Sequence, residues 1–198
     1  MKRQVIGITG GIGSGKSTAA ERLRLLGATV LNADETVTEL YEGSEPLKIE
    51  LVKAFGKEAV IEGGVNRGFI SRLVFEDELN LKRLNSIVHP LVQKRMEERT
   101  AEAQGVIVWD VPLLFELGMD ASVDVTVVVV ADRQERIGRV MKRSGLSFCE
   151  VEKRIRAQLS DFQRIRLADY VCINNGDRES LYRQIERIYR DIRGKNQL

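Results

Sequence analysis

Residues 10–17 read GGIGSGKS and decide the fold. They satisfy the pattern G-x-x-x-x-G-K-[ST] and follow residues 4–9, QVIGIT, a short apolar and β-branched run that is typical of a buried strand. Beyond the glycines, Ala19, Leu23 and Leu26 recur at helical spacing. The order of strand, glycine-rich loop and helix is the context that a phosphate-binding loop requires.

The residue types in this stretch suit the binding of phosphate. Glycines adopt backbone conformations that side chains would forbid, so successive N–H groups can converge on phosphate oxygens, and the following helix adds the positive end of its dipole. Lys16 would neutralise the β- and γ-phosphates of a nucleoside triphosphate, and the Ser17 hydroxyl would bind Mg²⁺. The alternative is a glycine-rich turn that matches by chance. We expect ATP to contact Gly11, Ile12, Gly13, Ser14, Gly15, Lys16, Ser17 and Thr18.

Strand-like and helical segments alternate along much of the chain. Further strand-like runs lie at residues 29–31, 106–109, 123–131 and 170–173. A helix begins near Arg133, and an amphipathic helix that contains Leu181 and Ile185 closes the chain. Such alternation predicts an α/β fold, in which a parallel sheet lies between layers of helices.

Two segments interrupt the alternation. Residues 35–104 contain almost no strand-like run but several helical stretches, so we expect an α-helical insertion there. Residues 144–166 form a polar, basic helical segment, which we interpret as a lid. The predicted architecture is therefore a three-layer, parallel-sheet core of the P-loop NTPase type with a helical insertion and a helical lid. The core would consist of residues 1–34, 105–143 and 167–198.

Two carboxylates follow predicted strands of this sheet. Asp34 comes just after the second strand and Asp110 ends the third, and ligands of open α/β sheets bind at the carboxyl ends of the strands. Asp34 suits the role of a general base that orients an acceptor hydroxyl and takes its proton. Asp110 suits the role of a carboxylate that supports Mg²⁺. The alternatives are that Asp34 caps the following helix and that Asp110 belongs to a plain turn.

A basic segment precedes the last predicted strand. Residues 133–166 carry ten Lys or Arg and four acidic residues. A solvated helix face is one interpretation. The other is a mobile cover that brings arginines to the transferred phosphoryl group, for which Arg139 and Arg143, one helical turn apart, are the best candidates. No pattern of aromatic residues accompanies the charges, so we expect no nucleic-acid partner.

Composition excludes several classes of protein. The chain of 198 residues has 43% hydrophobic and 30% charged residues, which is typical of a folded domain, and a formal net charge of only +2. Two cysteines provide no disulfide framework, and no apolar run reaches the length of a membrane span. We expect a cytoplasmic protein that binds no membrane and is a monomer or a weak homo-oligomer.

Several motifs together resemble the dephospho-CoA kinase family. They span nearly the whole chain in order and are GITGGIGSGKST at residues 7–18, NAD at 32–34, HP at 89–90, DVPLLFE at 110–116 and ADYVCINNG at 168–176. The loop alone specifies only a large superfamily, whereas the combination is far more discriminating. The resemblance implies phosphorylation by ATP of the ribose 3′-hydroxyl of dephospho-CoA, the last step of coenzyme A synthesis. It also implies a nucleotide core, a helical CoA-binding domain and a lid.

The resemblance also assigns roles to individual residues. Asp34 would be the catalytic base, and Asn174, Asn175 and Gly176 would lie beside adenine. Together with the residues argued above, the expected catalytic set is Asp34, Lys16, Arg139 and Arg143. The residues expected to contact the acceptor are Asp34, His89, Pro112, Leu113 and Leu114. His89 is the single histidine, and its place before Pro90 also fits a structural turn. Asn32 departs from the pattern, because many members have Asp there.

Two other functions remain open at this stage. Another P-loop kinase, such as a nucleoside monophosphate kinase, would transfer phosphoryl to a phosphate and would need no carboxylate base; Asp34 and the long insertion favour an alcohol acceptor. A regulatory nucleotide switch is the alternative outside metabolism. No N-K-x-D-like guanine-reading stretch is present, and the basic segment suits phosphoryl transfer better.

Overall fold

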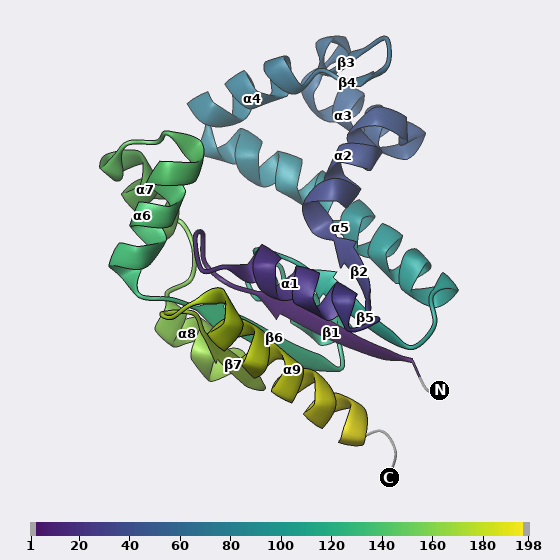
Figure 1. The fold of residues 1–198 in the computed structure, drawn as a ribbon. Helices are drawn as coiled ribbons and strands as arrows, with labels where there is room; N and C mark the ends of the chain where they lie inside the picture. Colours follow the sequence, from purple (N-terminus) through teal and green to yellow (C-terminus); the bar gives the residue numbers. More distant parts are fainter. Residues whose placement is uncertain (1–2, 196–198) are drawn as a thin grey trace. The chain divides into compact units, whose positions relative to one another are not determined.

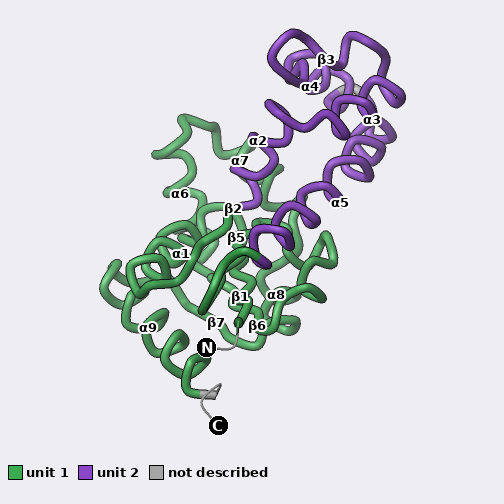
Figure 2. The backbone as a smooth tube through the Cα atoms, turned by 90° about the vertical axis from the view of Figure 1, so that its right-hand side faces the viewer, with its two compact units in different colours: residues 1–31, 102–198 green, residues 32–101 purple. Residues whose placement is uncertain are grey.

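The computed structural model describes residues 3–195 (Figure 1). The chain divides into two compact units, one formed by Met1–Leu31 with Glu102–Leu198 and the other by Asn32–Ala101 (Figure 2). We call them the sheet unit and the helical unit. The predicted insertion covered residues 35–104. The outermost residues of the predicted core, 1–2 and 196–198, lie outside the described range.

The sheet unit is built on five strands in the order β2-β5-β1-β6-β7. The strands are β1 (Gln4–Thr9), β2 (Thr29–Asn32), β5 (Val106–Asp110), β6 (Val125–Val130) and β7 (Tyr170–Ile173). The pairs β1–β5, β1–β6 and β6–β7 are parallel. All six residues of β1 are buried, as its continuous apolar sequence predicts for a strand covered on both faces. The predicted α/β class with a parallel sheet is confirmed.

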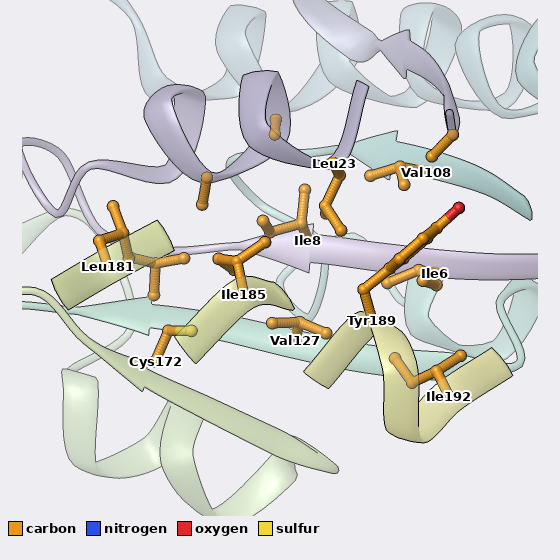
Figure 3. Packing of buried hydrophobic residues seen from close by; sticks show 14 residues of the cluster. Ile6, Ile8, Leu23, Val108, Val127, Cys172, Leu181, Ile185, Tyr189 and Ile192 are labelled. Atoms are coloured by element: carbon orange, nitrogen blue, oxygen red, sulfur yellow. The ribbon is translucent and has the colours of Figure 1, made fainter. Parts of the chain in front are cut away.

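Two helices cover one face of this sheet. They are α1 (Lys16–Leu25) and α9 (Arg178–Lys195), which also pack against each other. Their apolar stripes meet alternate strand residues, so that Leu23 and Ile185 pack with Ile6 and Ile8 (Figure 3). This cluster anchors the helix that follows the glycine-rich loop.

The opposite face of the sheet is also covered. Gly7 alternates with Ile6 and Ile8 and therefore faces away from α1, and a Cβ atom built on it would lie 2.8 Å from Leu114 Cδ2. The helix α8 (Asp161–Leu167) packs on β6. The connecting segment between β5 and β6 ends in the short helix η2 (Met119–Ser122). Helices α6 (Arg133–Ser144) and α7 (Phe148–Arg156) pack together through Ile137, Val140 and Val151.

The helical unit contains four α-helices, one short 3₁₀-helix and a small hairpin. Its elements are α2 (Ala33–Gly43), α3 (Glu45–Phe55), η1 (Lys57–Ala59), β3 (Val60–Ile61), β4 (Gly64–Val65), α4 (Arg67–Glu76) and α5 (Glu78–Glu102), of which the last residue belongs to the sheet unit. The buried residues of α5 include Leu84, Val88, Val92 and Met96, one every four residues. The antiparallel β3–β4 pair is a detail that helical periodicity did not predict.

Candidate active site

The glycine-rich loop connects β1 to α1 and is held by hydrogen bonds within itself and to Asn174. Gly13 and Gly15 have φ angles of +79° and +96°, in the left-handed region that favours glycine. The Ser14 N–H donates to the Gly11 carbonyl at 3.0 Å, and Asn174 Nδ2 donates to the Ser14 carbonyl at 2.8 Å. A Cβ atom on Gly15 would lie 2.1 Å from Asn174 Nδ2, so the loop is fitted to that side chain.

Lys16 and Asp110 form an ion pair at the start of α1. Asp110 is the last residue of β5 and is 2% exposed, and its register partner on β1 is Ile8. The sheet thus delivers this carboxylate to the loop. Ser17, the second residue of α1, is exposed. The first amides of α1 belong to the four that every helix leaves without an internal acceptor, and they carry its positive dipole end. The loop, the ammonium group and the carboxylate together form a site suited to a phosphate and its cation.

Arg136, which the sequence analysis did not single out, lies directly on the loop. Its Nε donates to the Ile12 carbonyl at 2.9 Å, and Nη1 donates to Asp161 Oδ2 at 2.7 Å. A Cβ atom on Gly11 would lie 2.3 Å from Arg136 Nη2, which explains the second glycine of the loop. Val140, one turn further along α6, is buried on the same side, and this apolar residue at i+4 is the sequence signal for the buried face.

Two residues of the basic segment contradict the solvated-face interpretation. Arg136 is 4% exposed and Arg164 is fully buried. The Arg164 Nη2 donates to Glu116 Oε1 at 2.9 Å, within the DVPLLFE motif. Helical periodicity could not predict the burial of Arg164, because Glu116, the carboxylate that neutralises it, lies 48 positions away in the sequence.

The predicted arginines lie in different surroundings. Arg139 Nη2 donates to the Asn174 carbonyl at 3.0 Å, and its guanidinium pairs with Glu135 at 3.6 Å. Arg143, one turn further along α6, is exposed. The Arg139 contact links α6 to the segment that follows β7.

The two asparagines that follow β7 make different contacts. Asn174 is buried and bonds the loop, whereas Asn175 is exposed and accepts a hydrogen bond from the Asp132 N–H through Oδ1 at 2.7 Å. Gly176 is exposed as well. The hydrogen bond from Asn174 to the loop is a contact that the sequence did not predict, because the resemblance placed Asn174 beside adenine with its two neighbours.

The segment after Asp110 contains one correction. Leu114 is fully buried and packs over Gly7, so the structure gives it a core position in place of the predicted contact with the acceptor. The reason is the missing side chain of Gly7, which leaves a hollow on this face of β1. Pro112 and Leu113 are half-buried, and the Pro112 carbonyl accepts a hydrogen bond from Thr9 Oγ1 at 3.1 Å.

Asp34 lies in the helical unit, in the first turn of α2. The alternative that it caps this helix is wrong, because Asn32 Oδ1 accepts the Asp34 and Glu35 N–H groups at 2.8 and 3.1 Å. Asn32, the residue that departs from the family pattern, is therefore the N-cap. The Asp34 carboxylate is exposed, at the helix end that favours negative charge.

His89 also lies in the helical unit, and the turn proposed for it is wrong. Both His89 and Pro90 are inside α5, since the tertiary packing of Val88 and Val92 holds the helix through the proline. Pro90 lines a surface hollow with Pro46, Ile49 and Leu91 of α3 and α5. His89 is half-buried, and desolvation lowers its pKa from the ordinary 6.5.

Comparison with known proteins shows the family. The sequence profile described as dephospho-CoA kinase matches residues 4–180. This chain belongs to the dephospho-CoA kinase family. Family members act as ATP-dependent kinases on small molecules, so the resemblance seen in the motifs is confirmed, as is the expectation of a kinase with a nucleotide substrate.

The individual relatives agree with this assignment. The dephospho-CoA kinase of Corynebacterium glutamicum is 38% identical over 192 residues, which cover 94% of this chain and 98% of the relative. A crystal structure from Thermus thermophilus is 38% identical with a TM-score of 0.82, covering 96% of this chain and 98% of that one. The dephospho-CoA kinase from Campylobacter jejuni, 21% identical, has the same fold with a TM-score of 0.72 and covers 98% of this chain and 100% of its own. The predicted P-loop NTPase fold is confirmed.

No helix among residues 3–195 combines the length and apolar character needed to cross a membrane. Within the same range, no group of three or more His, Cys, Asp or Glu side chains is arranged to hold a metal ion.

Proposed function

We propose that this protein transfers the γ-phosphoryl group of Mg²⁺-bound ATP to the ribose 3′-hydroxyl of dephospho-CoA, which yields coenzyme A and ADP. The observation that carries the proposal is the Lys16–Asp110 ion pair beside a glycine-rich loop, in a chain of this family. A cation and a carboxylate at the amino end of a helix match the needs of a nucleoside triphosphate and its metal ion.

The loop would bind and orient the triphosphate. Its left-handed glycines let the backbone approach Arg136 and Asn174 more closely than a Cβ atom would allow, and the first amides of α1 point out of the helix end. Lys16 would stabilise the negative charge on the β- and γ-phosphates. The Ser17 hydroxyl and the Asp110 carboxylate are oxygen donors of the kind that Mg²⁺ takes together with phosphate oxygens. The ion would supply neutralisation of the charge that develops during transfer.

Asp34 would act as the general base. The acceptor oxygen forms a bond to the γ-phosphorus as the bond from that phosphorus to the leaving oxygen of ADP breaks, and the hydroxyl proton passes to the Asp34 carboxylate. An exposed carboxylate that is free of the capping role suits this task.

The remaining residues would position the two substrates. In this proposal the helical unit, with His89, holds the acceptor together with Pro112 and Leu113. Asn175 and Gly176 lie beside adenine, and residues 144–166 form the lid. Arg139 and Arg143 stabilise the transferred phosphoryl group.

The test is ADP release from ATP with and without an acceptor. We expect ADP to form with dephospho-CoA and Mg²⁺, and to form far more slowly without the acceptor or with a nucleoside monophosphate in its place. Preference for the monophosphate would instead indicate a nucleotide kinase. Release that does not depend on any acceptor would indicate a nucleotide switch.

A further inference from the structure

Ile12 of the glycine-rich loop is held at its N–H, its carbonyl and its side chain. The N–H donates to Gln158 Oε1 at 2.9 Å, and the carbonyl accepts from Arg136 Nε at 2.9 Å. The side chain packs against the α6–α7 cluster that contains Ile137, Val140 and Val151. All these partners belong to the segment between β6 and β7, more than 120 positions from the loop in the sequence.

Arg136 and Gln158 are themselves fixed by further contacts. Arg136 Nη1 donates to Asp161 Oδ2 at 2.7 Å, and Arg136 is 4% exposed. A buried guanidinium that donates to both the Ile12 carbonyl and Asp161 has little freedom to turn away from Ile12.

The backbone next to Gln158 is clamped by a buried ion pair. The Leu159 N–H donates to Glu116 Oε1 at 3.0 Å, and the Leu159 carbonyl accepts from Arg164 Nη1 at 2.6 Å. Arg164 Nη2 donates to the same Glu116 oxygen at 2.9 Å, and Arg164 is fully buried. Hydrogen bonds between charged groups are strong in such a low-dielectric setting, so Gln158 projects from a rigid base.

The loop needs an external anchor because of its composition. Gly10, Gly11, Gly13 and Gly15 give its backbone far more freedom than other residues would, and ordering it costs conformational entropy. The Ile12 N–H already has an acceptor inside the protein, so this amide serves the loop conformation. A phosphate would instead be bound by other amides of the loop, so the expected contact between ATP and Ile12 would not involve this N–H.

We propose that Gln158 and Arg136 are positioning residues that hold the phosphate-binding conformation of the loop through Ile12, with the Glu116–Arg164 pair as their support. Gln158 and Arg136 thereby affect nucleotide affinity through Ile12, without touching the nucleotide themselves. The inference rests on the proposed function to the extent that the loop binds phosphate.

The test compares two glutamines of the same segment. Gln158→Met removes the acceptor of the Ile12 N–H at nearly constant side-chain length. Gln163→Met is the matched control, because Gln163 accepts hydrogen bonds from the Ser160 N–H and Oγ in the capping box of α8. Gln158→Asn keeps the amide but is one methylene shorter, and serves as the second variant.

The first readout is the Kd of Mg²⁺-ADP and Mg²⁺-ATP by calorimetry. We expect the Kd to rise about 5- to 50-fold in both Gln158 variants, the effect of losing one hydrogen bond to a group that then lacks a partner. The KM for dephospho-CoA should stay unchanged, and so should the Kd for nucleotide in Gln163→Met. The second readout is hydrogen–deuterium exchange of residues 10–17, which should speed up only in the Gln158 variants.

Each opposite result has a distinct meaning. Unchanged nucleotide affinity in the Gln158 variants would overturn the inference, and tighter binding would show that Gln158 competes with phosphate. An equal loss of nucleotide affinity in Gln158→Met and Gln163→Met would show that the effect comes from the folding of the segment. That result would also overturn the inference. A wild-type protein that binds neither nucleotide would refute the proposed function instead.

Discussion

The ammonium group of Lys16 is paired with the carboxylate of Asp110, so the first residue of α1 contacts the last residue of β5. The side chains are 12% and 3% exposed. Both groups that the sequence assigned to the triphosphate and its metal ion are thus in contact, and each also stabilises the other in the folded protein. Variants at this pair must be read for activity and stability together.

Lys16→Ala should lower kcat by about 10²- to 10³-fold, because it removes a cation that is preorganised for the transition state. It should also lower the free energy of unfolding by about 3 kcal/mol, because the buried Asp110 loses its cation. Adding Asp110→Asn should restore much of the stability but none of the activity. Urea unfolding and steady-state kinetics check both effects, and near wild-type kcat at saturating ATP would contradict the assignment of the loop.

Asp34→Asn should lower kcat by about 10²- to 10⁴-fold, since an amide cannot accept the acceptor's proton. The affinity for ATP should change little, and so should the melting temperature, because Asn32 rather than Asp34 caps α2. Kinetics and thermal unfolding are measured on the same preparation. A variant that is active but less stable would return Asp34 to a structural role.

Asn32→Ala should give the reverse pattern. It removes the acceptor of two N–H groups at the start of α2 and should destabilise the protein by about 1 kcal/mol. Asn32→Asp restores a capping oxygen and should recover that stability, which denaturant unfolding can measure. If Asn32→Ala leaves stability unchanged, the cap has no energetic weight in this helix.

Arg139→Ala and Arg143→Ala should each lower kcat by about 10³-fold if they stabilise the transferred phosphoryl group as proposed. The double variant should fall little below the worse single variant, since residues that share a role are not additive. Lys142→Ala, on the same helix and exposed, is the control and should retain activity. Activity of both single arginine variants close to that of the control would assign them to a solvated surface.

His89 should make stability depend on pH below neutrality. Burial lowers its pKa in the folded state below the ordinary 6.5, so between these two values the unfolded chain binds more protons. Stability should therefore fall as the pH falls through 6.5. Because His89 is the single histidine, His89→Gln should remove this part of the loss between about pH 7.5 and pH 5.5 in urea unfolding. An unchanged pH dependence would show that other groups cause it.

Local patterns determined much of this protein from sequence alone. The run of residues 4–26 encodes strand, loop and helix through burial, glycine conformation and helical spacing, which act between near neighbours in the chain. The phosphate loop, the Lys16 and Asp110 positions, the parallel sheet and the family all followed from such patterns. The place of the binding site was predictable because the carboxyl ends of parallel strands lie at one edge of the sheet.

Tertiary structure alone decided which distant side chains meet. The sequence predicts surface positions for Arg136 and Arg164, because both belong to a basic segment. In the folded chain, helix rotation and strand order bring each of them to a carboxylate, and bring Arg136 to the Ile12 carbonyl of the loop. Leu114 became a core residue because Gly7, more than one hundred positions earlier, lacks a side chain. Periodicity shows which face of an element is apolar. A charged side chain can be buried only where the folded chain supplies a partner of opposite charge. The burial of charged residues is therefore decided by the tertiary structure.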